Sequence, residues 1–159
     1  MPEFNDDVLI LVGHGATDRP AARDSATFIA ETLRERRLFK AVHAGFLKHP
    51  PFAKDLLKAA DGRRVFLVPH MAHAGFITRT VIPRDLGLDN DTRPVYLCDP
   101  VGAHPAIPQL IRDRLEASLR AHGIDSLTCA VILVGHGGGP NGVSARHTQT
   151  LADTVAARG

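Results

Sequence analysis

Two histidines in this sequence stand between glycines, each directly after an apolar run. Gly13-His14-Gly15 follows Val8 to Val12, and Gly135-His136-Gly137 follows Ala130 to Val134. Flanking glycines let the backbone turn sharply and remove side-chain bulk, so the imidazole of His14 should face an open crevice. A neutral imidazole can ligate a divalent transition metal or accept a proton near neutral pH. The alternative for His14 is a structural turn histidine that hydrogen-bonds a loop carbonyl.

A second group of histidines lies in the segment from Val68 to Arg79. His70 and His73 are three residues apart, which would put both on one face if the segment were helical. With His14 they could hold a metal ion, or one could ligate while another moves protons. Alternatively, either histidine could merely line a loop.

The glycine-rich segments lack the signatures of several other protein classes. Val12 to Thr17 matches neither of the two phosphate-binding glycine patterns, so nucleotide binding is weakly supported. Gly135 to Gly139 is superficially like an esterase oxyanion-hole segment, but the chain has no G-x-S-x-G elbow, which argues against serine hydrolysis. Cys98 and Cys129 have no C-x-x-C spacing and are expected to be buried thiols rather than disulfide or zinc ligands.

The elements that must position these histidines alternate between strand-like and helix-like patterns. Runs that are apolar on both faces are typical of a buried parallel sheet, and they occur at Val8–Val12, Ala41–Leu47, Arg64–Val68, Pro94–Cys98 and Cys129–Val134. Helices are predicted at Asp24–Arg37, Pro50–Ala60 and Pro105–His122, the last ending at Gly123. His70–Gly87 should be a long loop with a helical piece. We therefore predict an α/β fold of three layers, in which helices flank a mostly parallel β-sheet of flavodoxin-like topology. Binding residues should lie beyond the carboxyl ends of its strands.

An internal repeat suggests how the chain is divided. Val8 to Gly15 returns almost unchanged as Ala130 to Gly137, and each copy is followed by a polar loop and a helical pattern. Residues 1–125 are therefore predicted to form one complete α/β unit. Residues 126–159 would be the first strand, loop and helix of a second repeat. Either the chain is truncated, or this extra strand and helix pack onto the first unit.

The composition fits one ordinary globular domain. Of the 159 residues, 44% are apolar and 23% are charged. No apolar run approaches the roughly 20 residues that span a bilayer, and the acidic segment Met1 to Asp7 is unlike a signal peptide. We therefore expect a cytoplasmic protein with no membrane partner. The net charge of +2 does not demand nucleic acid, and nine histidines suit an acidic small-molecule ligand.

These features together resemble the CbiX-type sirohydrochlorin chelatases of the class II tetrapyrrole chelatase family. The resemblance covers most of residues 7–120 and rests on the order and spacing of Leu11–Gly15, Gly45–Leu47 before Pro50, Val68-Pro69, Gly75–Pro83 and Cys98–Pro105. It implies insertion of Co²⁺ or Fe²⁺ into sirohydrochlorin, an acidic tetrapyrrole, in cobalamin or sirohaem biosynthesis. No permanently bound cofactor is implied, because the metal is a substrate. Longer family members are two fused halves and shorter ones pair as homodimers, which implies either a homodimer or a missing second half that completes the site. The alternative is a protein that binds or carries a metal or tetrapyrrole without turnover.

The resemblance also implies roles for individual residues. His14 would bind the incoming metal and assist the loss of pyrrole protons. The second histidine of the family falls on Ile77, and its acidic residues fall on Lys48 and on Thr80 or Val81. His73 is the preferred substitute and His70 the next, so the predicted catalytic pair is His14 and His73. The predicted metal ligands are His14, His70 and His73. The predicted substrate-binding residues are Gly13, Gly15, Arg19, Lys48, Gly75, Arg79 and Arg84, and the second-repeat counterpart of His14 is His136.

Overall fold

The computed structural model describes residues 4–15, 21–135 and 142–157, which form two compact units, Met1–Gly102 and Ala103–Gly159. The strands of the first unit are β1 Phe4–Gly13, β2 Phe39–Phe46, β3 Val65–Pro69 and β4 Val95–Leu97. Its helices are α1 Ala21–Glu35, α2 Ala53–Ala59 and α3 Ile82–Leu86, with a π-helical turn η1 at Ile77–Val81 and a 3₁₀ turn η2 at Leu88–Asn90. A further 3₁₀ turn, η3 at Val101–Ala103, spans the boundary between the units in the chain. The second unit contains α4 Ile107–His122, η4 Ser126–Thr128 and α5 Val143–Ala156.

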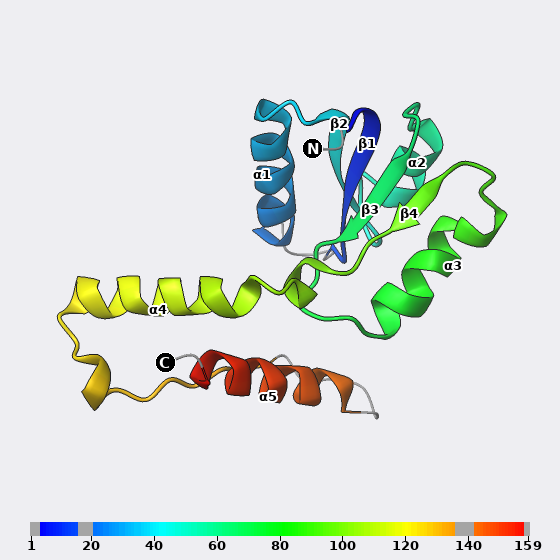
Figure 1. The fold of residues 1–159 in the computed structure, drawn as a ribbon. Helices are drawn as coiled ribbons and strands as arrows, with labels where there is room; N and C mark the ends of the chain where they lie inside the picture. The colour runs from blue at the N-terminus through cyan, green and yellow to red at the C-terminus, as the bar shows by residue number, and fades with distance from the viewer. Residues whose placement is uncertain (1–3, 16–20, 136–141, 158–159) are drawn as a thin grey trace. The chain divides into compact units, whose positions relative to one another are not determined.

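The four strands form one parallel sheet in the order β2-β1-β3-β4 (Figure 1). β1 is central, since Val12 is in register with Gly45 of β2 on one side and with Pro69 of β3 on the other. Helix α1 covers one face of the sheet, and α2 and α3 lie on the other. This is the order of a flavodoxin-like sheet, and the predicted α/β fold with a parallel sheet flanked by helices is confirmed.

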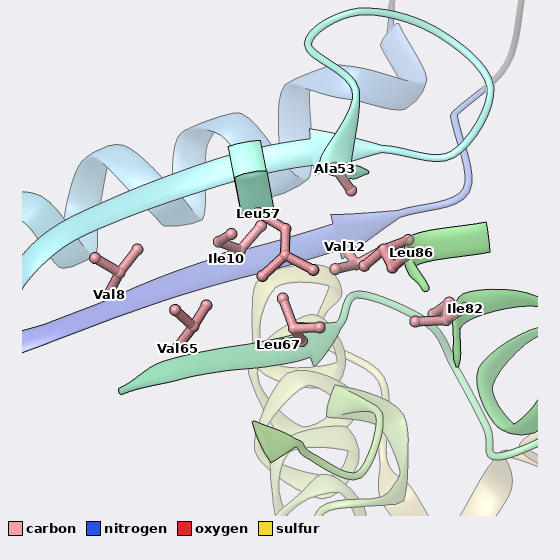
Figure 2. Packing of buried hydrophobic residues seen from close by; sticks show 9 residues of the cluster. All are labelled: Val8, Ile10, Val12, Ala53, Leu57, Val65, Leu67, Ile82 and Leu86. Carbon is pink, nitrogen blue, oxygen red and sulfur yellow. The ribbon is translucent and has the colours of Figure 1, made fainter. Parts of the chain in front are cut away.

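Residues of β1 are buried on both faces because each face has its own core. Val8, Ile10 and Val12 pack with β3, α2 and α3 residues in one cluster (Figure 2), whose members are Val8, Ile10, Val12, Ala53, Leu57, Val65, Leu67, Ile82 and Leu86. The alternate residues Leu9 and Leu11 pack against α1 in a second cluster. Since successive strand side chains point to opposite faces, an unbroken apolar run is what this two-sided burial requires.

The second unit departs from the predicted elements at one place. Cys129–Val134, predicted to be a strand, is irregular, and the side chains of Ile132 and Val134 are 83% and 88% exposed. A strand is held by hydrogen bonds to a neighbouring strand, and none of the described strands pairs with this segment. The strand prediction was therefore wrong for this copy of the repeat. Helix α4 was predicted correctly, and Gly123 ends it with φ +63°.

The two cysteines and the lengths of the helices can also be compared with the predictions. Cys98 and Cys129 are free thiols of intermediate exposure, so the prediction that they are buried was wrong. Cys98 follows the short edge strand β4 and Cys129 lies in the irregular segment, so both have incomplete cover. No helix in the described part of the chain is long and apolar enough to cross a membrane.

Candidate functional site

The carboxyl edge of the sheet gathers the predicted site residues of β1, β2 and β3. His14 follows β1 and His70 follows β3, and the His70 N–H donates to the Val12 carbonyl at 2.8 Å. On the other side of β1, the Leu47 N–H donates to the Gly13 carbonyl at 3.1 Å, so Lys48 also leaves the sheet at this edge. Parallel strands end together, and this is where α/β folds place their ligands.

His14 has an exposed imidazole that is suited to bind a metal ion. Partial desolvation lowers its pKa, and the positive charge of Lys48 lowers it further. The ring is therefore neutral at pH 7 and offers a lone pair. Lys48 stands where the family resemblance expects an acidic residue, and its charge repels an approaching cation that a carboxylate would attract.

His70 is held more firmly than His14. Its Nε2 lies 3.1 Å from the hydroxyl oxygen of Ser25 on α1, and burial lowers its pKa. Its Nδ1 is buried without a hydrogen-bond partner among the residues that the structure describes. A hydroxyl can donate or accept, so the Ser25 contact permits either neutral tautomer of the ring. His70 thus combines a packing role between β3 and α1 with one nitrogen that is free to act.

His73 lies in a loop that is fixed at both ends. The Gly102 N–H donates to the Met71 carbonyl at 2.9 Å. The Thr78 hydroxyl oxygen accepts the Gly75 N–H at 2.9 Å and donates to the Gly75 carbonyl at 3.0 Å. A Cβ atom on Gly75 would lie 3.3 Å from Nε2 of His73, so the ring rests on this glycine. Residues 70–74 are not helical, so the three-residue spacing of the two histidines does not place them on a helical face.

Position 77, where the family resemblance expects a histidine, is occupied by an isoleucine that packs against the core. Ile77 packs against the cluster beneath α2 and α3, and it begins the π-helical turn. The Ile82 N–H donates to the Ile77 carbonyl, five residues earlier, which defines this turn. Such turns are frequent at functional sites, but here the side chain at its first position is apolar and half-buried.

The predicted basic residues differ in their availability. Lys48 and Arg79 are exposed, and Arg79 lies on the π-helical turn. Arg84 is also exposed, but its guanidinium forms an ion pair with Asp85 at 2.8 Å. An anionic ligand would have to compete with this carboxylate for Arg84. Arg19 and His136 lie outside the described residues.

The glycines that flank His14 leave room for two side chains of the β2 segment, a contact that the sequence did not reveal. A Cβ atom on Gly13 would lie 2.7 Å from the Phe46 ring, and one on Gly15 would lie 2.8 Å from the imidazole of His49. Gly15 also has φ +73°, which favours glycine. His49 therefore packs against the residue that follows His14, and sequence reasoning missed it. The available signal was its position three residues after the end of β2, at the same edge of the sheet.

No preformed metal cage is present in this part of the molecule. Within residues 4–15, 21–135 and 142–157, no three histidine, cysteine, aspartate or glutamate side chains are grouped so that they could hold an ion. The edge instead offers separate neutral imidazoles and exposed basic side chains. Such an arrangement can bind a metal weakly, accept protons and attract carboxylates, as transient delivery of a metal to an acidic ligand requires.

Comparison with known proteins gives one family and several relatives. The sequence profile of the CbiX family matches residues 8–118. The chain is 29% identical over 170 residues to a probable sirohydrochlorin cobaltochelatase of Halobacterium salinarum, covering 92% of this chain and 58% of the relative. It is 29% identical over 139 residues to the sirohydrochlorin cobaltochelatase of Methanopyrus kandleri, covering 70% of this chain and 96% of that protein. The chain thus spans little more than half of the Halobacterium protein.

The fold is also found in a solved structure. The sirohydrochlorin chelatase SirB of Bacillus subtilis, crystallised in complex with cobalt, superposes with a TM-score of 0.72. The match covers 94% of this chain and 62% of SirB, with 16% sequence identity. At this identity the likeness concerns the fold.

Proposed function

This chain belongs to the CbiX family, and we propose that it is a metal chelatase that inserts Co²⁺ into sirohydrochlorin. The observation that carries the proposal is the exposed, neutral imidazole of His14 at the carboxyl edge of the sheet, next to His70 and Lys48. The names of the Halobacterium and Methanopyrus relatives favour cobalt over iron.

The proposed reaction asks three things of this edge. The metal ion must exchange water for another ligand, and His14 can supply an imidazole nitrogen. Two pyrrole N–H protons must leave, and the imidazole of His73 or His70, or that of His14 once the metal has left it, can accept them. The carboxylates of the tetrapyrrole must be held, and the exposed side chains of Lys48 and Arg79 provide positive charge. Holding both substrates together makes the transfer effectively unimolecular.

The departures at Ile77 and Lys48 favour one second candidate, a carrier that binds the metal or the tetrapyrrole without turnover. The two functions differ in one measurement. Protein, sirohydrochlorin and either Co²⁺ or Fe²⁺ at limiting concentration are mixed anaerobically, and the visible spectrum is followed against a protein-free control. We expect faster metallation with Co²⁺, and His14→Ala should return the rate to that of the control. A spectral shift without acceleration would support the carrier, and faster metallation with Fe²⁺ alone would assign iron.

We further propose that the site is completed by a second copy of the chain or by a second half. The chain aligns with nearly the full length of the Methanopyrus protein but with only 58% of the Halobacterium protein. Sedimentation equilibrium distinguishes the two cases. A dimer at micromolar concentration supports completion by a second copy, whereas a monomer that is active only after a second half is added supports the other.

A further inference from the structure

His49 lies at the carboxyl edge of the sheet but has no role in the proposed reaction as described above. It lies in the loop after β2, which folds back so that the Phe46 N–H donates to the Pro51 carbonyl at 2.9 Å. This turn places the His49 ring 4.3 Å from the Phe46 ring, centre to centre, and against Gly15. His14 directly precedes Gly15, so the His49 ring packs against the residue next to His14 in the chain.

The hydrogen bonding of His49 fixes which of its nitrogens carries a proton. Nδ1 lies 2.8 Å from the Pro50 carbonyl oxygen, and a carbonyl can only accept, so Nδ1 is the donor. In the neutral ring Nε2 then carries the lone pair. Histidines that ligate metals commonly donate their other ring N–H to a backbone carbonyl, which orients the ring and makes the ligating nitrogen more basic.

The lone pair on Nε2 is unused. This atom is buried and has no hydrogen-bond partner within the described residues. Buried polar atoms are usually satisfied, so an orphaned acceptor calls for an explanation. Gly15 contributes no side chain here, and a Cβ atom at that position would lie 2.8 Å from Nε2. Access of a metal ion to the buried Nε2 requires the ring to turn away from Gly15, and the hydrogen bond to the Pro50 carbonyl opposes that turn.

We propose that Nε2 of His49 is a second imidazole ligand, together with His14, for the divalent metal ion on its way to the tetrapyrrole. The inference rests on the proposed chelatase function. It assigns to the β2 side of the site a neutral nitrogen donor where Lys48 has replaced the acidic residue of the family pattern.

Binding of Co²⁺ alone tests the proposal independently of turnover. Titration calorimetry and the visible absorption of Co²⁺ are measured for the unchanged protein, His14→Ala, His49→Asn and the double variant. The side-chain amide introduced by His49→Asn retains a donor for the Pro50 carbonyl but has no atom at the place of Nε2. His122→Asn is the matched control, because the His122 ring makes the same 2.8 Å contact through Nδ1, to the Ser118 carbonyl, on exposed α4.

We expect His49→Asn and His14→Ala each to weaken Co²⁺ binding at least about tenfold, with little further loss in the double variant and none in His122→Asn. If His49→Asn fails to fold, His49→Phe keeps the ring packed on Phe46 without a nitrogen and should show the same loss. A folded His49 variant that binds Co²⁺ as the unchanged protein does would overturn the assignment, as would absence of Co²⁺ binding by the unchanged protein. Loss of Co²⁺ binding in the variants, with no metallation of sirohydrochlorin by the unchanged protein, would leave His49 as a ligand and refute the chelatase.

Discussion

At the scale of single residues, the site consists of neutral imidazoles beside a lysine. The pKa of His14 is lowered by partial desolvation and by Lys48, and the pKa of the more buried His70 is lowered by burial. Both rings therefore keep their lone pairs at pH 7, as metal binding and proton acceptance require. The positive charge of Lys48 helps to keep the His14 ring neutral, but it also repels an approaching metal cation.

Replacement of Lys48 by glutamate should reverse that electrostatic effect. Because the lysine lowers the pKa of His14, Lys48→Glu should raise this pKa. At pH 8 the carboxylate should attract Co²⁺ where the lysine repelled it, and so strengthen Co²⁺ binding roughly two- to fivefold. As the pH falls to 6, the gain should shrink, since more of the His14 ring is then protonated. NMR titration of the histidine ring protons and Co²⁺ titrations at the two pH values measure both effects. Lys58→Glu on α2 is the control, and an equal change in that variant would contradict the argument.

The two loop histidines should respond differently to removal. His73→Ala should slow metallation with little change in the unfolding transition, because its ring rests on Gly75 at the surface of the loop. His70→Ala should also destabilise the protein by about 0.5–1.5 kcal/mol, because the half-buried ring loses its packing and its hydrogen bond to the exposed Ser25 hydroxyl. Metallation rates and urea unfolding separate the cases. An unchanged rate in His73→Ala would transfer the role of second histidine to His70.

At the scale of the elements, two loops at the carboxyl edge are held in contact by a glycine. The segment after β3 and the turn η3 approach so closely that a Cβ atom on Gly102 would overlap the Ala72 backbone. The Gly102 N–H also donates to the Met71 carbonyl. The position of His73 therefore depends on Gly102, a residue of a different loop whose side chain takes no part in the chemistry.

Gly102→Ala should reduce metallation much more than it reduces stability. The added methyl group must push the two loops apart, since backbone atoms cannot yield as a flexible side chain can. A displacement of about 1 Å in a reacting group can cost up to about 100-fold in rate. Gly87→Ala is the control: it strains a left-handed residue at φ +71° at a cost of about 1 kcal/mol, but no atom lies within 4 Å of the added carbon. Similar rates in the two variants would show that loop contact does not position the site.

At the scale of the whole molecule, the first copy of the repeat forms a buried strand and the second is irregular and exposed. Ile10 in the first copy is fully buried in β1, whereas the corresponding Ile132 is 83% exposed in an irregular segment. The first copy has β2 and β3 on either side and a core on both faces. The second has no pairing strand among those that the structure describes.

Matched substitutions in the two copies test this difference. Ile10→Ala should destabilise the sheet unit by about 2–5 kcal/mol, because it leaves a cavity in a closed core. Ile132→Ala should change the same unfolding transition by less than about 0.5 kcal/mol, since an exposed side chain loses little burial. Urea unfolding monitored by far-ultraviolet circular dichroism measures both. A large loss from Ile132→Ala would mean that the second copy packs into a core in solution.

Local pattern was sufficient for much of this protein. The unbroken apolar runs at Val8–Val12 and Arg64–Val68 predicted buried parallel strands, because only a strand with a core on each face needs apolar side chains at every position. The glycines around His14 likewise indicated a tight turn at the edge of the sheet. These properties depend on residues that are neighbours in the chain.

Other properties were decided by residues that are distant in the chain. Cys129–Val134 has the same pattern as β1 but forms no strand, since pairing needs a neighbour that its own residues cannot supply. The contact of His49 with Gly15 and that of His70 with Ser25 likewise join residues 34 and 45 positions apart, and only the packing of the sheet creates them. The sequence by itself therefore determined the fold class, the four strands of the sheet and the position of His14 after the first of them. The tertiary structure decided which copy of the repeat is a strand and where His49 and His70 pack, because both depend on contacts between distant elements.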